Sequence, residues 1–155
     1  METQATPLQN SAEVEIRSLY KQLIDSWNRR NAADFAVLFT EDSNVIGFDG
    51  SQMNSAAEIG ASLTQIFAEH VTAPYIAKIR AVRFLTPAVA LLRAVVGMIP
   101  PGQTKLNPAV NSIQTLIAIK QDASWKITLF QNTPAQFHGR PELVQQLTDE
   151  LRRLL

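Results

Sequence analysis

Asp49 and His70 are the two titratable side chains whose positions suit acid–base chemistry. Asp49 follows a short apolar run that predicts a strand, on the strand face that includes Gly47, where a carboxylate can move a proton or accept a ligand hydroxyl group. The pair Asp49-Gly50 also predicts a turn in which the carboxylate accepts backbone N–H groups, and we favour this interpretation. His70 follows Phe67 by one turn on the apolar face of a predicted helix, where it can titrate near neutral pH or bond the last carbonyl groups of the helix.

A second group of candidates consists of polar residues inside apolar predicted strands. Gln114 and Asn132 carry amides that must find partners in the protein or in a ligand if they are buried. In a regular strand, Gln131 and Asn132 point to opposite faces, so they cannot both line one cavity. Arg93 stands alone in a very apolar strand and must pair with an acid, reach an interface or meet an anionic ligand.

Composition excludes several kinds of chemistry. The chain has 155 residues, no cysteine and two histidines. Disulfides, thiol nucleophiles, cysteine-ligated metals and three-histidine metal centres are therefore excluded. The sequence also lacks the glycine-rich fingerprint of dinucleotide-binding proteins. We expect neither a metal nor a cofactor.

Charge and hydropathy indicate the kinds of partner and the cellular location to expect. Fourteen basic residues balance fourteen acidic ones, so we expect neither a nucleic-acid nor a membrane partner. No apolar run reaches the ~18 residues of a membrane span, and the first ten residues do not form a signal peptide. A cytoplasmic location is the expectation.

The charges are unevenly distributed along the chain. Residues 1–75 hold ten acidic and four basic side chains, whereas residues 76–155 hold four acidic and ten basic ones. This asymmetry suggests an acidic helical half that lies on a basic sheet, the interpretation we favour. The alternative is a basic mouth that attracts an anionic ligand, built from Lys78, Arg80, Arg83 and Arg93.

Hydrophobic periodicity predicts three helices before residue 75. The first begins at a capping-box variant, Asn10 to Glu13; the second spans 32–39 after the cap Asn31; the third begins at the capping box Ser55 to Glu58. The apolar stripe of the first helix consists of Ile16, Leu19, Tyr20, Leu23, Ile24 and Trp27. The inward face of the third consists of Ile59, Leu63, Ile66, Phe67 and His70.

Strands follow the helices. A short strand is expected over 44–48, and residues 75–85, 88–99, 109–120 and 124–133 have the spacing of long strands joined by short links. Pro141 suits the first turn of a final helix, whose apolar line is Leu143, Leu147, Leu151 and Leu154. We expect an α+β fold in one domain: a disordered segment at 1–10, a cone at 12–133 made of a strongly bent, mostly antiparallel sheet closed by three helices around a pocket, and a linker and tail helix at 134–155.

Several segments in this order resemble the nuclear transport factor 2-like superfamily, whose members have a cystatin-like fold. They are Trp27-Asn28, Asp34, Leu38-Phe39, Asp42, Phe48-Asp49-Gly50, Trp125-Lys126-Ile127 and Phe130-Gln131-Asn132-Thr133. More closely, the chain is similar to small SgcJ/EcaC-type proteins of uncharacterised function, related to SnoaL-like enzymes and ketosteroid isomerases. The resemblance implies a homodimer formed through the sheet and an apolar pocket in the cone.

The resemblance leaves catalysis open. Placed by eye, the three catalytic positions of a ketosteroid isomerase fall at Leu23, Gly47 and near Ile117, none of which can do that chemistry. Our first hypothesis is a protein that binds a small apolar or weakly anionic molecule. The alternatives are a cofactor-independent isomerase, dehydratase or oxygenase-like enzyme that acts on a polyketide- or steroid-like substrate through Asp49 or His70, and a dimeric association module. The expected ligand contacts are Tyr20, Trp27, Phe48, Phe67, Arg93, Gln114 and Asn132.

Overall fold

The computed structural model describes residues 7–155, so residues 1–6 of the segment expected to be disordered lie outside the described part. The first helix, α1, runs over Pro7–Asn28. It begins three residues before Asn10, so the expected capping box there is wrong. A proline suits the first turn because that turn has no acceptor for its missing N–H. The predicted stripe is buried from Ile16 to Leu23, where Ile16 and Leu23 are fully inaccessible, and partly buried at Ile24 and Trp27.

The second helix, α2, is shorter than the sequence suggested, Ala32–Ala36, although Asn31 does cap it by accepting the N–H of Asp34 at 2.9 Å. Phe39 belongs instead to the first strand, β1 (Phe39–Ile46), and its ring stacks on that of Phe35 at 5.3 Å. Burial of this aromatic pair favours an extended backbone at Phe39, where we expected the helix to continue. The strand expected at 44–48 therefore starts earlier and ends earlier.

The predicted third helix, four long strands and final helix follow in the predicted order, together with a two-residue strand and a short 3₁₀ turn that were not predicted. They are β2 (Gln52–Met53), α3 (Ala56–Glu69), β3 (Tyr75–Thr86), β4 (Val89–Met98), a short 3₁₀ turn (Pro108–Val110), β5 (Ser112–Gln121), β6 (Ser124–Pro134) and α4 (Pro141–Arg152). The strands form one sheet in the order β2-β1-β6-β5-β4-β3. All neighbours are antiparallel except β1 and β6, which are parallel. The expected α+β, cystatin-like architecture is confirmed.

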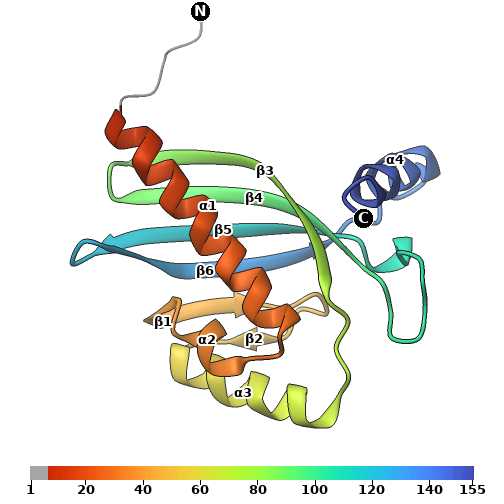
Figure 1. Ribbon diagram of the computed structural model, residues 1–155, viewed down its shortest axis with the longest axis horizontal. Coiled ribbons are helices and arrows are strands. Elements are labelled where there is room, and N and C mark those ends of the chain that lie inside the picture. Colours follow the sequence, from red (N-terminus) through yellow and green to blue (C-terminus); the bar gives the residue numbers. More distant parts are fainter. Residues whose placement is uncertain (1–6) are drawn as a thin grey trace, which may run out of the picture.

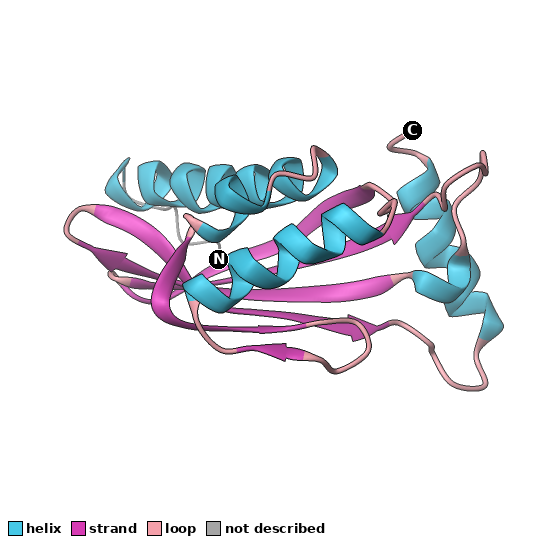
Figure 2. Cartoon of the chain, turned by 90° about the horizontal axis from the view of Figure 1, so that it is seen from below, coloured by secondary structure: helices cyan, strands magenta, loops and turns pink. Residues whose placement is uncertain are grey.

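One face of the curved sheet packs against α1, α2 and α3 (Figures 1 and 2). Alternate residues of the strands point to this face, among them Leu92, Leu116 and Ile127, each fully buried. They meet Ile16 and Leu23 of α1 in one hydrophobic cluster.

A β-bulge in β6 changes which residues point inward. Ile117 pairs with Leu129, but the next residue of β5, Ala118, pairs with Ile127, so Thr128 has no partner across the ladder. The extra residue shifts the alternation beyond it. The inward residues of β6 are consequently Trp125, Ile127, Phe130 and Asn132.

The tail helix α4 lies at one end of the sheet (Figure 1). It packs against Val95, which points to the face opposite α1 because its neighbour Ala94 points into the main core. Its cluster comprises Val95, Leu106, Ala135, Leu147 and Leu151. The predicted apolar line of this helix ends at Leu151, because Leu154 lies beyond the helix and is 48% exposed. Among residues 7–155, no helix is both long and apolar enough to cross a membrane.

Candidate ligand-binding cavity

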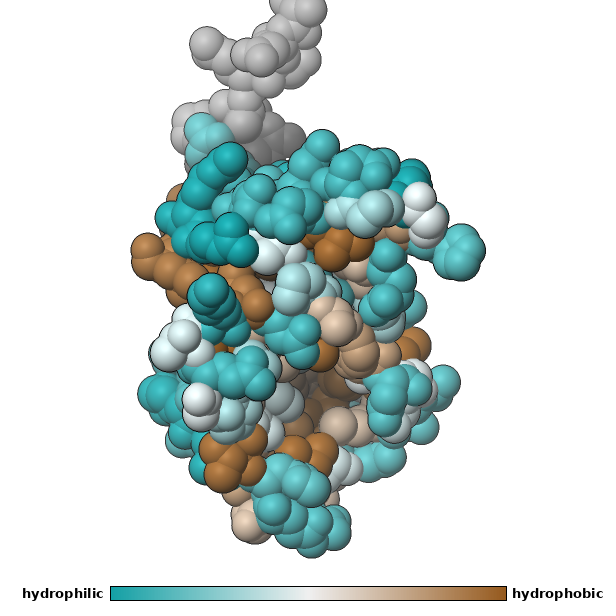
Figure 3. All heavy atoms as spheres, turned by 90° about the vertical axis from the view of Figure 1, so that its right-hand side faces the viewer, coloured by the Kyte–Doolittle hydropathy of each residue, from teal (hydrophilic) through white to brown (hydrophobic). Residues whose placement is uncertain are grey.

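A cavity of about 300 Å³ lies between the helical layer and the sheet. Its lining is mainly apolar and comes from α1, α2, α3, the β1–β2 turn and strands β1, β2, β3, β4 and β6. Among the contributing side chains are Ile24, Phe35, Val45, Leu63, Tyr75 and Phe130. Viewed from the right-hand side of Figure 1, the molecule is hollowed near its centre, with hydrophobic atoms in the hollow and mostly hydrophilic residues around it (Figure 3).

Trp27 forms one wall of the cavity and is held rigidly. Its indole Nε1 donates to the carbonyl oxygen of Ala73 at 3.0 Å, and its ring packs at 5.4 Å from that of Phe67 and 5.3 Å from that of Tyr75. Asn28 fixes the start of β3 by accepting the N–H of Tyr75 at 2.8 Å and donating to its carbonyl oxygen at 3.2 Å. Trp27 is among the lining residues of the cavity, whereas Phe67 packs against the Trp27 ring and lies outside the lining.

Tyr75 also lines the cavity, at the point where β3 begins. Burial raises the pKa of its hydroxyl group to about 12. At neutral pH the group is therefore an uncharged phenol, able to donate or accept a hydrogen bond.

The polar feature of the cavity is a buried relay of three side chains. The Tyr20 hydroxyl donates to Gln114 Oε1 at 2.6 Å, and Gln114 Nε2 donates to Asn132 Oδ1 at 2.8 Å. Asn132 Nδ2 faces the carbonyl oxygen of Ile46 at 3.5 Å. Burial, and secondarily the nearby Tyr75 phenol, raise the pKa of Tyr20, which stays neutral. Of these three residues, Asn132 alone lines the cavity, and Tyr20 and Gln114 lie behind it.

Asp49 lies in a turn and also at the edge of the cavity. It accepts the N–H of Ser51 at 2.9 Å within a turn in which Gly50 has a φ of +90°, and it also borders the cavity, next to Phe48. Hydrogen bonds from Ser51 hold the pKa of the Asp49 carboxyl below its usual range, so the group is a carboxylate at neutral pH. Asp49 is exposed.

His70 and Arg93 lie outside the cavity. His70 is the exposed C-cap of α3: its N–H donates to Ile66, and its carbonyl oxygen accepts from the Arg30 side chain. Arg93 is exposed on the outer face of the sheet, in a depression shared with Arg80 and Phe137.

The basic residues of the second half do not form a mouth. The Arg80 guanidinium binds Glu150 of α4 through two contacts of 3.0 and 2.9 Å, and Lys78 Nζ lies 3.8 Å from the same carboxylate. No lysine or arginine of the described residues lines the cavity.

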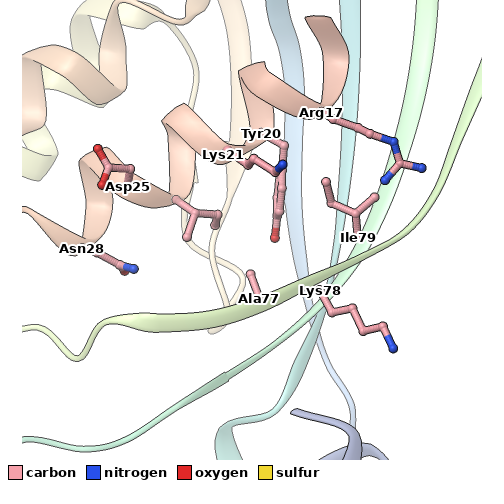
Figure 4. Close-up of a pocket in the computed structure, with 9 residues that line it drawn as sticks. Arg17, Tyr20, Lys21, Asp25, Asn28, Ala77, Lys78 and Ile79 are labelled. Carbon is pink, nitrogen blue, oxygen red and sulfur yellow. The ribbon is translucent and has the colours of Figure 1, made fainter. Parts of the chain in front are cut away.

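A larger depression of about 480 Å³ runs between α1 and β3 (Figure 4). It is an open groove: Ala77 and Ile79 point toward α1, whereas Lys78 points away from it. Of its charged groups on α1, Arg17 pairs with Glu13 at 3.1 Å and Asp25 pairs with Arg29 at 2.8 Å. We therefore place the candidate site in the internal cavity. Within residues 7–155, no group of three histidine or acidic side chains could hold a metal ion.

Comparison with known proteins agrees with this architecture. No family model and no curated protein matches the chain. A solved domain of unknown function with a cystatin-like fold from Nostoc punctiforme is 30% identical over 97% of this chain and 98% of its own length, with a TM-score of 0.77. The chain belongs to the same family as this cystatin-like domain. A nuclear transport factor 2-like protein of unknown function from Shewanella oneidensis shares the fold, with 18% identity over 79% of this chain and 98% of its own and a TM-score of 0.66.

More distant neighbours share the fold. A putative scytalone dehydratase from Novosphingobium aromaticivorans has 14% identity over 85% of this chain and 89% of its own, with a TM-score of 0.71. A putative calcium/calmodulin-dependent protein kinase II association domain from Thiobacillus denitrificans has 11% identity over 77% and 94%, with a TM-score of 0.69.

Proposed function

We propose that this protein binds a small, uncharged and largely apolar molecule in the cavity beside Trp27 and Asn132. The observation that carries the proposal is an apolar cavity of about 300 Å³ with one buried amide in its wall. Ligand sites are typically of this kind, with mostly apolar walls and few polar groups that fix orientation. The absence of basic side chains among the described lining residues, together with the Asp49 carboxylate, disfavours the weakly anionic ligand that the sequence allowed.

A neutral fluorescent probe tests the proposal. N-phenyl-1-naphthylamine fluoresces strongly in apolar surroundings, and we expect it to bind the wild-type protein. Ile66 lines the cavity from α3, so Ile66→Trp should fill the space and abolish binding. The matched control is Val37→Trp, because Val37 is 60% exposed and lies outside the cavity lining. Equal binding by the two variants would refute the proposal.

A second candidate is a cofactor-independent isomerase or dehydratase, supported by the position of Asp49 at the cavity. Its lowered pKa makes it a weak base, since general bases work best with a pKa near the working pH. The names of two structural neighbours, a putative scytalone dehydratase and a ketosteroid isomerase-like protein, supply substrates to test. Conversion of scytalone or of a β,γ-unsaturated ketosteroid by the wild type but not by Asp49→Asn would support this candidate. Unchanged turnover in the variant would remove Asp49 from the site.

The outer face of the sheet supports self-association, which we propose as a homodimer. Leu91, Ile117 and Leu129 are paired across β4, β5 and β6 and form an apolar row that is half-buried in the monomer. Two structural neighbours are called association domains. Sedimentation velocity should give a dimer for the wild type and a monomer for Ile117→Lys, while Leu85→Lys, in an exposed position elsewhere, stays dimeric. A monomeric wild type would refute this proposal.

A further inference from the structure

We propose that the ligand presents a hydrogen-bond acceptor, such as a ketone oxygen, to Asn132 Nδ2, and that Tyr20 and Gln114 fix the orientation of this amide. This inference rests on the proposed binding function. It adds the direction of the polar contact, which selects one class of apolar molecule from many.

The orientation of Asn132 is determined first by Ile46. The carbonyl oxygen of Ile46 can only accept a hydrogen bond, and the nearest amide atom of Asn132 lies 3.5 Å from it. If the amide were turned over, two oxygens would face each other there. Nitrogen therefore faces Ile46, and Oδ1 faces Gln114.

The other end of the relay requires the same direction. The Tyr20 phenol has one proton, and among the described residues Gln114 is its hydrogen-bond partner, at 2.6 Å. If the Gln114 amide were turned over, its NH₂ group would meet the phenol oxygen and the phenol proton would lose its acceptor. Tyr20 is only 2% exposed and Gln114 is fully buried, and an unmet buried donor costs about 1–3 kcal/mol.

The contacts at Ile46 and at Tyr20 are therefore satisfied by the same arrangement. In it, Tyr20 donates a hydrogen bond to Gln114, Gln114 donates one to Asn132, and the Asn132 NH₂ group is left on the cavity side. Asn132 Nδ2 has two protons, and its contact with Ile46 is long, so at least one proton remains available. Asn132 is only 8% exposed and lines the cavity. A ligand that buries this proton without an acceptor would be disfavoured.

The other polar groups of the cavity wall are already engaged or lie at the surface. Trp27 Nε1 is bonded to Ala73, and the Asp49 carboxylate is bonded to Ser51 in an exposed turn. A ketone oxygen satisfies the Asn132 donor without adding a proton of its own, whereas a hydroxyl group would bury a further donor. Ser51 and Tyr75 also bring hydroxyl groups to the described wall. Ser51 is exposed, whereas Tyr75 is partly buried, so the experiment must separate Asn132 from Tyr75.

The first experiment compares two probes of the same shape, 2-acetylnaphthalene and 2-isopropenylnaphthalene, in which C=CH₂ replaces C=O. Equilibrium dialysis should show the ketone binding about three- to tenfold more tightly, the range for one hydrogen bond. The infrared carbonyl stretch of ¹³C-labelled ketone should shift to lower frequency on binding. Equal affinities without a shift would overturn this inference and leave the binding function intact. Failure of both probes to bind would overturn both.

Variants identify the donor. Asn132→Asp keeps an oxygen acceptor for Gln114 but removes the NH₂ group, so the preference for the ketone should disappear. Tyr20→Phe leaves the cavity wall unchanged and releases the relay, so the preference should fall while the hydrocarbon binds as before. If Tyr75→Phe removed the preference and Asn132→Asp retained it, the contact would belong to Tyr75 and the inference would be wrong. Thermal unfolding of each variant verifies that it is folded.

Discussion

Gly97 of β4 and Leu151 of α4 approach so closely that any side chain at Gly97 would require its neighbours to shift. A Cβ atom added at Gly97 would lie 3.0 Å from Leu151 Cδ1 and 3.1 Å from both Leu106 Cδ2 and Asn111 Oδ1. Each of these atoms belongs to a segment packed on the outer face of the sheet. The glycine therefore sets the distance at which α4 can dock.

Gly97→Ala should consequently destabilise the protein by about 1–3 kcal/mol, the usual cost of overpacking. Urea unfolding followed by circular dichroism measures the change. The control is Gly60→Ala in α3, where the added Cβ would lie 3.4 Å from Ala36 Cβ and helix propensity improves. That variant should be neutral or more stable, and equal destabilisation of both would refute our account of Gly97.

Glu150 anchors α4 to β3 by charge as well as by packing. Its carboxylate forms ion pairs with Arg80 and Lys78, both of which are about half exposed. Exposed ion pairs contribute little, so Glu150→Gln should lower the free energy of unfolding by less than about 1 kcal/mol. The difference from wild type should vanish in 1 M NaCl, because salt screens such pairs. A loss that persists at high salt would mean that hydrogen bonding outweighs charge here.

The relay should behave as a coupled unit in stability measurements. Tyr20→Phe leaves Gln114 Oε1 without its donor, and Gln114→Leu leaves the Tyr20 hydroxyl without its acceptor; each should cost about 1–3 kcal/mol. The double variant should cost clearly less than the two together, since neither partner then remains unmatched. Additive losses in chemical denaturation would show that the two side chains act independently.

The two tyrosines of the chain should resist ionisation in the folded state. Burial raises the pKa of both Tyr20 and Tyr75 above the ordinary value near 10. Below pH 10 both states hold these protons, so stability does not depend on them. Above pH 10 the unfolded chain loses the protons first, so stability falls as pH rises toward 12.

Phenolate absorbance should therefore appear together with unfolding, as a cooperative step measured alongside circular dichroism. Tyr75→Phe should make stability less sensitive to pH in this range. A smooth titration centred near pH 10 in folded protein would contradict the burial of these hydroxyl groups.

Much of the fold could be predicted because long periodic segments carry a strong signal. The stripe from Ile16 to Trp27 and the alternation in β3 to β6 place the helices and strands correctly, and Pro141 marks the start of α4. Local pattern could not reveal the two-residue strand β2 or the parallel pairing of β1 with β6. Both depend on contacts between segments far apart in the sequence.

The site was less predictable than the fold, for identifiable reasons. Alternation from Trp125 assigns Gln131 to the inner face, but the unpaired Thr128 reverses this and turns Asn132 inward. A bulge of this kind leaves no compositional signal. Tyr20 and Gln114 were recognised as inward polar residues, yet their hydrogen bond joins positions 94 residues apart. Arg93 drew attention as an isolated charge, and exposure on the outer face accounts for it.

The bulge at Thr128 also limits how this gene segment can change. Deletion of the extra residue would restore regular alternation from Trp125 and leave Asn132 on the inner face. A one-residue insertion after Phe130 would instead exchange the faces of the residues beyond it, so Asn132 would face outward and Gln131, one methylene longer, would take its place opposite Gln114. Natural variation in this segment should therefore include loss of the bulge residue but not insertions after it.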